Sequence, residues 1–318
     1  MATQGFSTTG EDVAAETKEF NEALAAMLAT QPSLPEVDDA PQIRADREAG
    51  KGAFPVPVRL AEGVDRTVPG RAGDIPVRVF RPGDVRGVLL HLHGGGWTLG
   101  TADAQDALLW ELAQSAGVAV VSVDYRLAPE HPYPVGPDDC EDAARWLIAE
   151  AATEFGTDRL VIAGESAGAH LAAVTLLRLG DRARAFAAAQ LTFGVFDLTM
   201  TPSQRQGHDK LLIPTETMRW FYEQFLPGRG AEECRAPDIS PLYADLRGMP
   251  PARFVVGTED PLLDDSLFMA ARWQAAGNGA ELEIVAEAVH GFVSFPVTIA
   301  KRELTRQSEY IARAVTSA

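Results

Sequence analysis

Cysteine is nearly absent from the chain, which has only Cys140 and Cys234 among its 318 residues. A disulfide framework is therefore not expected, because small disulfide-built domains carry many more cysteines for their length. The sequence also lacks a His-Glu-x-x-His motif and any closely spaced group of cysteines and histidines. These absences exclude the common zinc sites and indicate two reduced thiols in a cytosolic protein without a bound metal.

Long hydrophobic runs are missing as well. No apolar stretch reaches about 18 residues, the length at which a helix can cross a bilayer. Residues 1–20 carry several acids and lack the apolar centre of a signal peptide. We therefore expect neither a membrane span nor export, and we expect the protein in the cytoplasm.

Positive charge is the third scarce feature. The chain has 28 lysines and arginines against 45 aspartates and glutamates, which gives a formal net charge of −17. Polyanionic nucleic acid and anionic membrane surfaces would be repelled by such a protein. The acidity therefore disfavours nucleic acid and stable membrane association as partners, although solubility alone also explains it.

Hydrophobic residues make up 46% of the chain, which is enough for a sizeable core. Strand-like apolar runs alternate with segments of helical periodicity over roughly 250 residues, a pattern typical of a doubly wound, mostly parallel sheet. The first strands are expected at residues 58–68, 75–80 and 87–92. Residues 1 to about 50 are expected to be helical, with no strand of their own.

A serine lies between two glycines where a strand pattern changes to a helix pattern. The stretch Gly164-Glu165-Ser166-Ala167-Gly168 follows an apolar run and precedes a good helix-forming segment. Glycine two positions before and after the serine suits a sharp turn, since larger side chains would collide there. The Ser166 hydroxyl would stand above the sheet at the positive end of a helix, as acyl transfer requires. An ordinary strand-to-helix turn of small residues is the alternative interpretation.

Three consecutive glycines, Gly94, Gly95 and Gly96, follow the strand expected at residues 87–92. They indicate backbone that lies close to a ligand or adopts unusual dihedral angles. A phosphate cradle is one interpretation, but Leu99 stands where a dinucleotide fingerprint needs glycine, and no P-loop lysine follows. An oxyanion hole, whose N–H groups bind negative charge that develops on a carbonyl oxygen, is the preferred one.

An acyl-transfer serine needs a histidine base and an orienting acid, which follow it on this scaffold in the order acid, then histidine. His290 lies on a glycine-containing loop after the last expected strand and is the predicted base, whereas His170 is expected to pack on the serine's helix and His208 lies in an irregular segment. Asp260 is the predicted acid because the proline after it favours an extended backbone. Capping of the next helix is its alternative role, and Asp197 is the alternative acid.

These motifs, taken in chain order, resemble those of the bacterial hormone-sensitive-lipase-like esterases, the family IV lipolytic enzymes of the α/β-hydrolase superfamily. The resemblance implies an α/β-hydrolase fold, with a mostly parallel, doubly wound sheet of about eight strands and a helical cap. It further implies that Gly95, Gly96 and Ala167 supply the oxyanion N–H groups. Glu165 stands where the family often has aspartate, outside the triad. The matching stretches are residues 93–96, 124–134, 164–168, 260–262 and 290–292.

We therefore predict a serine carboxylesterase that cleaves short-to-medium acyl esters through an acyl-enzyme on Ser166, without a cofactor. The predicted domains are an N-terminal helical cap segment, residues 1–54, and a catalytic domain, residues 55–318, of which residues 198–238 contribute to the cap. An N-acyl or amide hydrolase or deacetylase with the same triad is one alternative. A non-catalytic binding protein on this fold is another, which the presence of His290 disfavours. A homodimer is one oligomeric state that the sequence leaves open.

The apolar residues of the cap predict an acyl pocket above the serine. An apolar stripe in the N-terminal helix needs a partner, and the aromatic insertion in the catalytic domain offers one. Aromatic residues at helical spacing are more often simply core, which is the alternative interpretation. The predicted pocket residues are Phe20, Leu24, Trp97, Trp220, Phe221 and Phe225.

Overall fold

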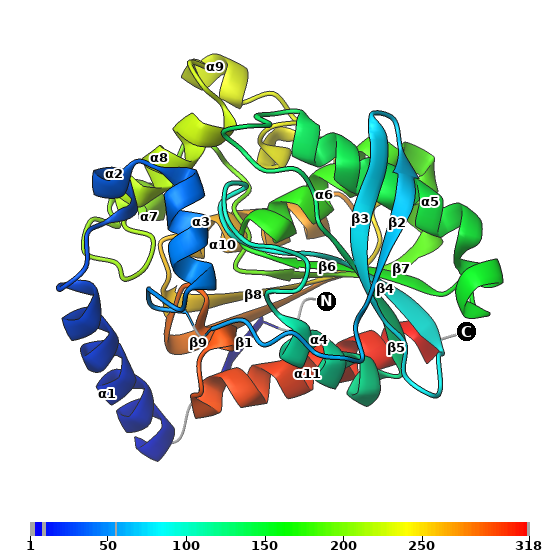
Figure 1. Cartoon of the computed structure of the whole chain (residues 1–318), viewed down its shortest axis with the longest axis horizontal. Helices are drawn as coiled ribbons and strands as arrows, with labels where there is room; N and C mark the ends of the chain where they lie inside the picture. The colour runs from blue at the N-terminus through cyan, green and yellow to red at the C-terminus, as the bar shows by residue number, and fades with distance from the viewer. Residues whose placement is uncertain (1–3, 8–10, 55, 317–318) are drawn as a thin grey trace.

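The computed structural model describes residues 4–7, 11–54 and 56–316 (Figure 1). Its described residues form a nine-stranded sheet in the order β1-β9-β8-β7-β6-β4-β5-β3-β2. Neighbouring strands are parallel except where β3 pairs with β2 and with β5. The strands are β1 (Gln4–Ser7), β2 (Val64–Gly70), β3 (Gly73–Phe80), β4 (Gly87–Leu92), β5 (Val118–Val123), β6 (Leu160–Glu165), β7 (Phe186–Thr192), β8 (Ala252–Glu259) and β9 (Ala280–Val289).

Helices cover both faces of the sheet, α4 and α11 on one and α5, α6 and α10 on the other (Figure 1). Helices α2, α3 and α7–α9 lie toward one end, and α1 lies beside β9 and the start of α11. No helix of the described ranges is long and apolar enough to span a membrane. The helices are α1 (Glu11–Leu28), α2 (Leu34–Val37), α3 (Ala40–Glu48), α4 (Asp106–Ala116), α5 (Val135–Phe155), α6 (Ala167–Leu179), α7 (Pro202–Arg205), α8 (Thr215–Phe225), α9 (Ala231–Cys234), α10 (Leu263–Ala275) and α11 (Thr298–Thr316), with 3₁₀ turns at Gly180–Ala185, Pro241–Tyr243 and Phe292–Ser294.

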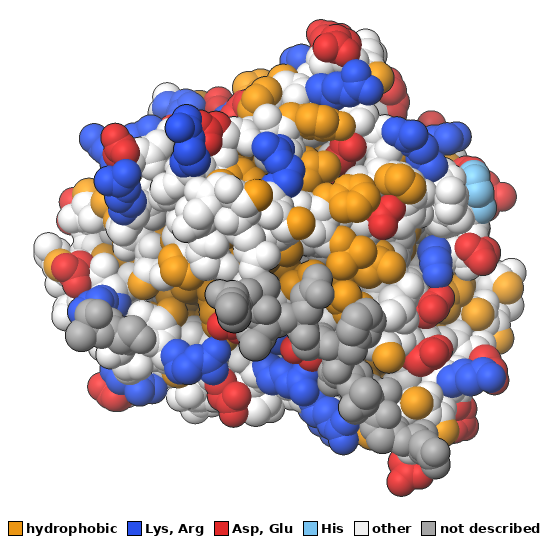
Figure 2. Space-filling model, turned by 180° about the vertical axis from the view of Figure 1, so that it is seen from behind, with side chains coloured by type: hydrophobic (Ala, Val, Ile, Leu, Met, Phe, Trp, Pro, Cys, Tyr) orange, Lys and Arg blue, Asp and Glu red, His pale blue; other side chains and the backbone are white. Residues whose placement is uncertain are grey.

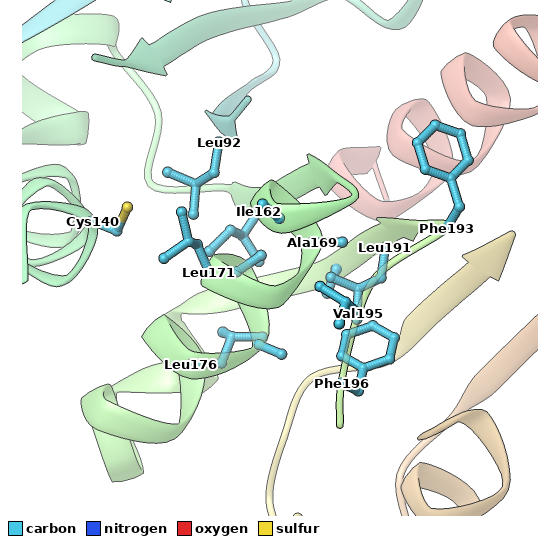
Figure 3. Close-up of a cluster of buried hydrophobic side chains, with 14 of the residues drawn as sticks. Leu92, Cys140, Ile162, Ala169, Leu171, Leu176, Leu191, Phe193, Val195 and Phe196 are labelled. Carbon is cyan, nitrogen blue, oxygen red and sulfur yellow. The ribbon is translucent and has the colours of Figure 1, made fainter. Parts of the chain in front are cut away.

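The central strands are buried on both faces, which explains why they are almost continuously apolar. Successive side chains point to opposite faces, so Ile162 of β6 joins the core under α5 and α6, whereas Val161 joins the core under α4 and α11. Figure 3 shows Leu171 of α6 beside Ile162 and Leu92 on the first of these faces. The serine turn between β6 and α6 is therefore held by packed elements on both sides.

Charged side chains of both signs are spread over the face opposite to that of Figure 1, around an area where hydrophobic side chains gather (Figure 2). The mixture agrees with the many surface ion pairs that the acidic chain forms, for example Arg66 with Glu154 at 2.9 Å. Exposed pairs of this kind contribute little to stability. The surface therefore says more about solubility than about the fold.

Two details of the predicted secondary structure are wrong. Residues 4–7 do form a strand, β1, which adds to the edge of the sheet in parallel with β9. The strand expected at residues 58–68 begins only at Val64. The buried guanidinium of Arg78 donates to the carbonyl oxygens of Leu60 at 2.6 Å and Gly63 at 3.0 Å. The carbonyl groups of Leu60 and Gly63 thus bind a side chain instead of a neighbouring strand.

Candidate active site

The serine turn has a backbone that only small neighbours permit. Ser166 has φ 56° and ψ −120°, a conformation that costs a residue with a side chain about 1–3 kcal/mol. A Cβ on Gly164 would lie 2.4 Å from the backbone of Gly168, and a Cβ on Gly168 would lie 1.8 Å from the carbonyl oxygen of Leu92. The two glycines let β4, β6 and α6 approach closely, and this approach holds the serine in its strained conformation.

The structure brings Ser166, His290 and Asp260 into one hydrogen-bonded chain. His290 Nε2 is 2.9 Å from Ser166 Oγ, and His290 Nδ1 is 2.9 Å from Asp260 Oδ2. With Nδ1–H donated to the carboxylate, Nε2 is available to accept the serine proton. Asp260 Oδ1 also accepts from the Leu262 backbone N–H at 2.8 Å. This is a local turn bond before α10, whose N-cap position is Leu262, so Asp260 does not cap the helix as the alternative interpretation expected.

Other residues considered from the sequence lie in different surroundings. Asp197 accepts hydrogen bonds from the backbone and hydroxyl of Thr199 and from the hydroxyl of Tyr243, at 2.6 to 3.0 Å. No hydrogen bond joins it to His290 within the residues that the structure describes. His208 is exposed and pairs with Glu216 at 3.0 Å. Neither Asp197 nor His208 is thus placed to assist Ser166.

His170 is fully buried behind the serine turn. Its Nδ1 accepts from Trp97 Nε1 at 3.0 Å, and its Nε2 donates to the carbonyl oxygen of Ile239 at 2.8 Å. Burial lowers the pKa of His170 to about 4, so the ring is neutral at pH 7. The side chain links α6 to the glycine-rich loop and to the segment after α9, which agrees with the expected packing role.

The glycine-rich loop lies directly beside Ser166. A Cβ on Gly94 would be 2.9 Å from the carbonyl oxygen of Glu165 and 3.5 Å from the Cβ of Ser166. Gly95 and Gly96 have φ values of 118° and 60°, which favour glycine. A Cβ on Gly95 would lie 2.1 Å from the carbonyl oxygen of Leu99. The loop therefore needs all three glycines for close backbone approach.

Three backbone N–H groups at this place are without an acceptor. Among the described parts of the chain, no hydrogen bond engages the N–H of Gly95, Gly96 or Ala167. Ala167 is the first residue of α6, where an N–H has no partner within the helix. The Gly95 carbonyl accepts from Leu99 N at 2.8 Å, which closes the loop into a turn. Such N–H groups next to a nucleophile suit a developing oxyanion better than a phosphate chain.

Polar residues in the buried strands and just beyond their ends surround this loop, and they were not singled out from the sequence. The Tyr125 hydroxyl donates to the His93 carbonyl oxygen at 2.7 Å, and the two rings stack at 4.2 Å. His91 bridges β4 to both neighbours, through Ser122 Oγ at 2.9 Å and Glu165 Oε2 at 3.0 Å. His91 within an otherwise apolar strand was the sequence signal for this network, because a buried polar group needs hydrogen-bond partners.

Asp265, one of the acids that follow Asp260 in the sequence, is a buried carboxyl group with a structural role. It accepts hydrogen bonds from the backbone N–H of Phe196 and Asp197, from Thr201 Oγ1 and from Gln204 Nε2, at 2.7 to 2.9 Å. Burial raises its pKa to about 7, although these hydrogen bonds act in the opposite direction. Asp265 fastens the start of the insertion, after β7, to α10.

The aromatic residues predicted for the pocket fall into two groups. Trp97 and Phe225 stack on each other at a centroid distance of 4.6 Å and are almost fully buried, at 2% and 1% exposure. They fill the core beneath the glycine-rich loop, as the alternative interpretation expects. Phe221 lies on the loop itself, since a Cβ on Gly96 would be 2.2 Å from its ring.

The remaining predicted pocket residues connect the N-terminal segment to the rest of the chain. Trp220 Nε1 donates to Asp38 Oδ1 at 2.7 Å. Phe20 packs against Phe295 at a centroid distance of 5.1 Å, and Leu24 is buried. These contacts join α1 and α2 to the segment after His290 and to α8, so the N-terminal helices are placed around the same end of the sheet as the serine.

Comparison with known proteins gives a consistent result. Residues 89–294 match a family model described as alpha/beta hydrolase fold. The carboxylic ester hydrolase LipN of Mycobacterium tuberculosis is 35% identical over 268 residues, which cover 81% of this chain and 71% of LipN. An ethyl acetate hydrolase of Pseudomonas putida is 34% identical over 232 residues, 69% of this chain and 71% of that protein. A solved hormone-sensitive lipase from a metagenome library superposes with a TM-score of 0.81 at 29% identity, covering 94% of this chain and 98% of that one.

Proposed function

The chain belongs to the α/β-hydrolase fold family, in its hormone-sensitive-lipase-like branch, and is a carboxylic ester hydrolase. We propose that Ser166 is the nucleophile of this reaction. His290 is the proposed base and Asp260 the residue that orients it. The observation that carries the proposal is the hydrogen-bonded chain Ser166–His290–Asp260, with both contacts at 2.9 Å. It is supported by the strained serine backbone, since such strain is kept where function needs it.

The reaction follows from this geometry in two halves. His290 Nε2 takes the hydroxyl proton as Ser166 Oγ attacks the ester carbonyl carbon, and the carbonyl oxygen becomes an oxyanion. His290 then protonates the leaving alcohol, which leaves an acyl group on the serine. Water attacks the acyl-enzyme by the same path and releases the acid. The Nδ1 contact with Asp260 stabilises the imidazolium that forms in each half.

The oxyanion is proposed to bind the N–H groups of Gly95, Gly96 and Ala167. Donors that are already aimed at the developing charge need no reorganisation during the reaction, and one such donor is typically worth about 10²–10³ in kcat. The support is that these three N–H groups adjoin the serine and that the chain's own carbonyl groups do not engage them in the described ranges. The positive end of the α6 dipole also stabilises negative charge on the oxyanion.

We further propose that residues 1–54 form a cap segment on the catalytic domain, residues 55–318, and that residues 198–238 complete the cap. The support is the bond between Trp220 and Asp38 at 2.7 Å and the packing of Phe20 on Phe295. A cap of this kind excludes water from the oxyanion and limits the length of the acyl chain, so short-to-medium acyl esters are the proposed substrates. Phe20, Leu24, Trp220 and Phe221 are its proposed pocket residues.

The location that we propose is the cytoplasm. Cys140 and Cys234 are both free and buried, and burial raises the pKa of both thiols. Both cysteines are therefore present as thiols, as a reducing compartment would keep them. A homodimer stays an alternative to the monomer, which sedimentation of the purified protein would decide.

A covalent label tests the nucleophile. An organophosphate should inactivate the protein and add one phosphoryl adduct, which peptide mass spectrometry should place on Ser166. Ser166→Ala should remain folded by circular dichroism, take up no label and lose ester hydrolysis by about 10⁶, the loss known for a serine nucleophile. Inactivation with the label on another residue would remove Ser166 from this role. A panel of acyl esters and amides of graded length would then define the substrate range.

A further inference from the structure

Arg47, in the last turn of α3, is half-buried and forms no ion pair with an acid in the part of the chain that the structure describes. This sets it apart from the other arginines of the described ranges that are buried or half-buried, since each of those contacts a carboxylate. The pairs are Arg44–Glu130, Arg78–Asp106, Arg126–Asp139, Arg145–Glu141, Arg178–Asp238, Arg253–Glu303 and Arg306–Glu283.

The surroundings of Arg47 give it an aromatic contact but no counter-charge. Its guanidinium lies over the ring of Phe54 at 5.2 Å. The adjacent acid, Asp46, is engaged by Lys51 at 2.8 Å. Burial alone lowers the pKa of Arg47 to about 10, so the group remains charged at pH 7. A half-buried cation without hydrogen bonds is costly, which suggests that its partner is outside the chain.

The location of Arg47 is close to the proposed catalytic residues. Its contact Phe54 lies against Gly291, where a Cβ would be 3.1 Å from the ring, and Gly291 directly follows His290. Phe54 also stacks on Phe295 at 5.5 Å. Arg47 is therefore separated from the loop of the proposed base by a single aromatic ring.

The same helix is fixed to the glycine-rich loop on its other side. Arg44 Nη1 donates to the carbonyl oxygen of Thr98 at 2.9 Å and, less closely, to that of Ala128. Helix α3 thus lies between the loop proposed to bind the oxyanion and the loop that carries His290 (Figure 1). Arg44 satisfies its donors within the chain, whereas the Arg47 donors, three residues later, meet no acceptor among the described residues.

We propose that Arg47 binds a free carboxylate of the substrate, so that the preferred substrates are esters that carry one additional, unesterified carboxylate group. This inference rests on the proposed function and specifies its substrate class. The planar guanidinium can hold a carboxylate through two parallel hydrogen bonds, and Phe54 supplies an apolar surface for the carbon chain between the two groups. Hydrolysis of a half-ester of a dicarboxylic acid would release an alcohol and the dicarboxylate.

The overall charge of the protein makes this cation more significant. A chain with net charge −17 repels anions in general. An anionic ester would therefore bind better where a positive charge near the site offsets this repulsion. Arg47 supplies such a charge one aromatic ring away from the loop of the proposed base, and Arg44, its neighbour on the helix, is already paired with Glu130.

The test compares charged and neutral esters of similar size. Monoethyl adipate carries the carboxylate on its acyl part, 3-(butyryloxy)propanoate carries it on its alcohol part, and ethyl heptanoate is the neutral reference. Arg47→Gln should lower kcat/KM for at least one carboxylate ester by about 10- to 100-fold, as expected for loss of a charge-assisted hydrogen bond. Ethyl heptanoate should change by less than about threefold. Arg47→Lys should restore part of the loss by keeping the charge.

Lys18→Gln is the matched control, since it removes an exposed positive charge from the N-terminal segment without releasing Asp46 from Lys51. It should leave all three esters nearly unchanged, because exposed charges are screened. Equal effects of Arg47→Gln on charged and neutral esters, or no effect on either, would overturn the inference while ethyl heptanoate hydrolysis still supports the esterase. A wild-type protein that hydrolyses none of the three would instead reject the proposed function together with the inference.

Discussion

The serine turn and the N-terminal cap segment are held in place by different kinds of contact. At the turn, backbone meets backbone so closely that a Cβ on Gly168 would lie 1.8 Å from the Leu92 carbonyl oxygen. The helices of the cap segment are attached through side chains, for example Trp220 to Asp38 and Arg44 to Thr98, although β1 pairs with β9 through its backbone. Backbone atoms in hard-sphere contact cannot move closer together, so the turn has one geometry. A single side-chain hydrogen bond contributes only about 1 kcal/mol, so the cap helices can shift at little cost.

This difference suggests a division of labour between the two regions. The turn, the glycine-rich loop and the His290 loop set the positions of reacting atoms, and small errors there reduce the rate strongly. The cap segment determines which substrates reach those atoms, and its contacts can change without loss of the chemistry. Substitutions in the first region should therefore affect kcat, and those in the second should affect substrate preference.

After the nucleophile itself, the largest expected effect comes from the orienting acid. Asp260→Asn should lower kcat by about 10⁴, because the amide favours the wrong imidazole tautomer. Asp197→Asn is the matched control and should change kcat less than tenfold, since Asp197 bonds to Thr199 and Tyr243 instead of His290. Steady-state kinetics of both variants on one short ester checks this. The reverse order of the two effects would assign the role to Asp197.

Steric enforcement of the turn can be tested with a single methyl group. Gly168→Ala should lower kcat by about 10² or more, because the clash with Leu92 displaces the serine. Gly83→Ala is a suitable control, since a Cβ at Gly83 would meet nothing within 4 Å. Activity and thermal unfolding of both variants should be measured. A Gly168→Ala enzyme with normal kcat would contradict the claim that this region allows no adjustment.

Removal of the cap segment should change the preference among acyl chain lengths more than the rate of the bond-breaking step. Deletion of residues 1–45 takes away Phe20, Leu24 and Arg44, exposes the apolar surface that they cover, and should lower solubility and activity. It also removes β1, so part of the loss will come from the sheet edge. Each methylene that the cap buries contributes about 0.8 kcal/mol to binding. Without the cap this contribution is lost, so kcat/KM should depend less on the length of the acyl chain. An unchanged chain-length profile would show that the catalytic domain alone builds the pocket.

The smallest expected effect concerns Asp265, which lies where the insertion joins the catalytic domain. Burial raises its pKa from 3.8 to about 7, so between these values the folded protein holds a proton that the unfolded chain has lost. The free energy of unfolding should therefore fall as pH rises through this range. Asp265→Asn lacks this dependence, and its stability relative to wild type should improve by roughly 1–3 kcal/mol between pH 4 and pH 8. Denaturant unfolding at several pH values measures the difference, and parallel pH profiles would contradict the expectation.

Much of the fold and part of the site could be predicted from local sequence patterns. Alternating apolar runs indicate the parallel sheet, and the glycines around Ser166 and at positions 94–96 indicate tight backbone turns. These predictions succeed because they depend on sterics and periodicity within a few residues. The chain order of serine, acid and histidine also narrows the search to a few candidates at the ends of strands.

Only the tertiary structure decided which distant side chains meet. Asp197 and Asp260 both follow strands, but only Asp260 reaches His290, because β8 lies next to β9 in the sheet. Arg78 takes the carbonyl groups of Leu60 and Gly63 and so prevents the early part of a strand that looked favourable in the sequence. The sequence by itself determined the turns and the layers, since these depend on neighbouring residues. Pairing between remote charges depends on packing, and packing places no acid against Arg47 within the described ranges.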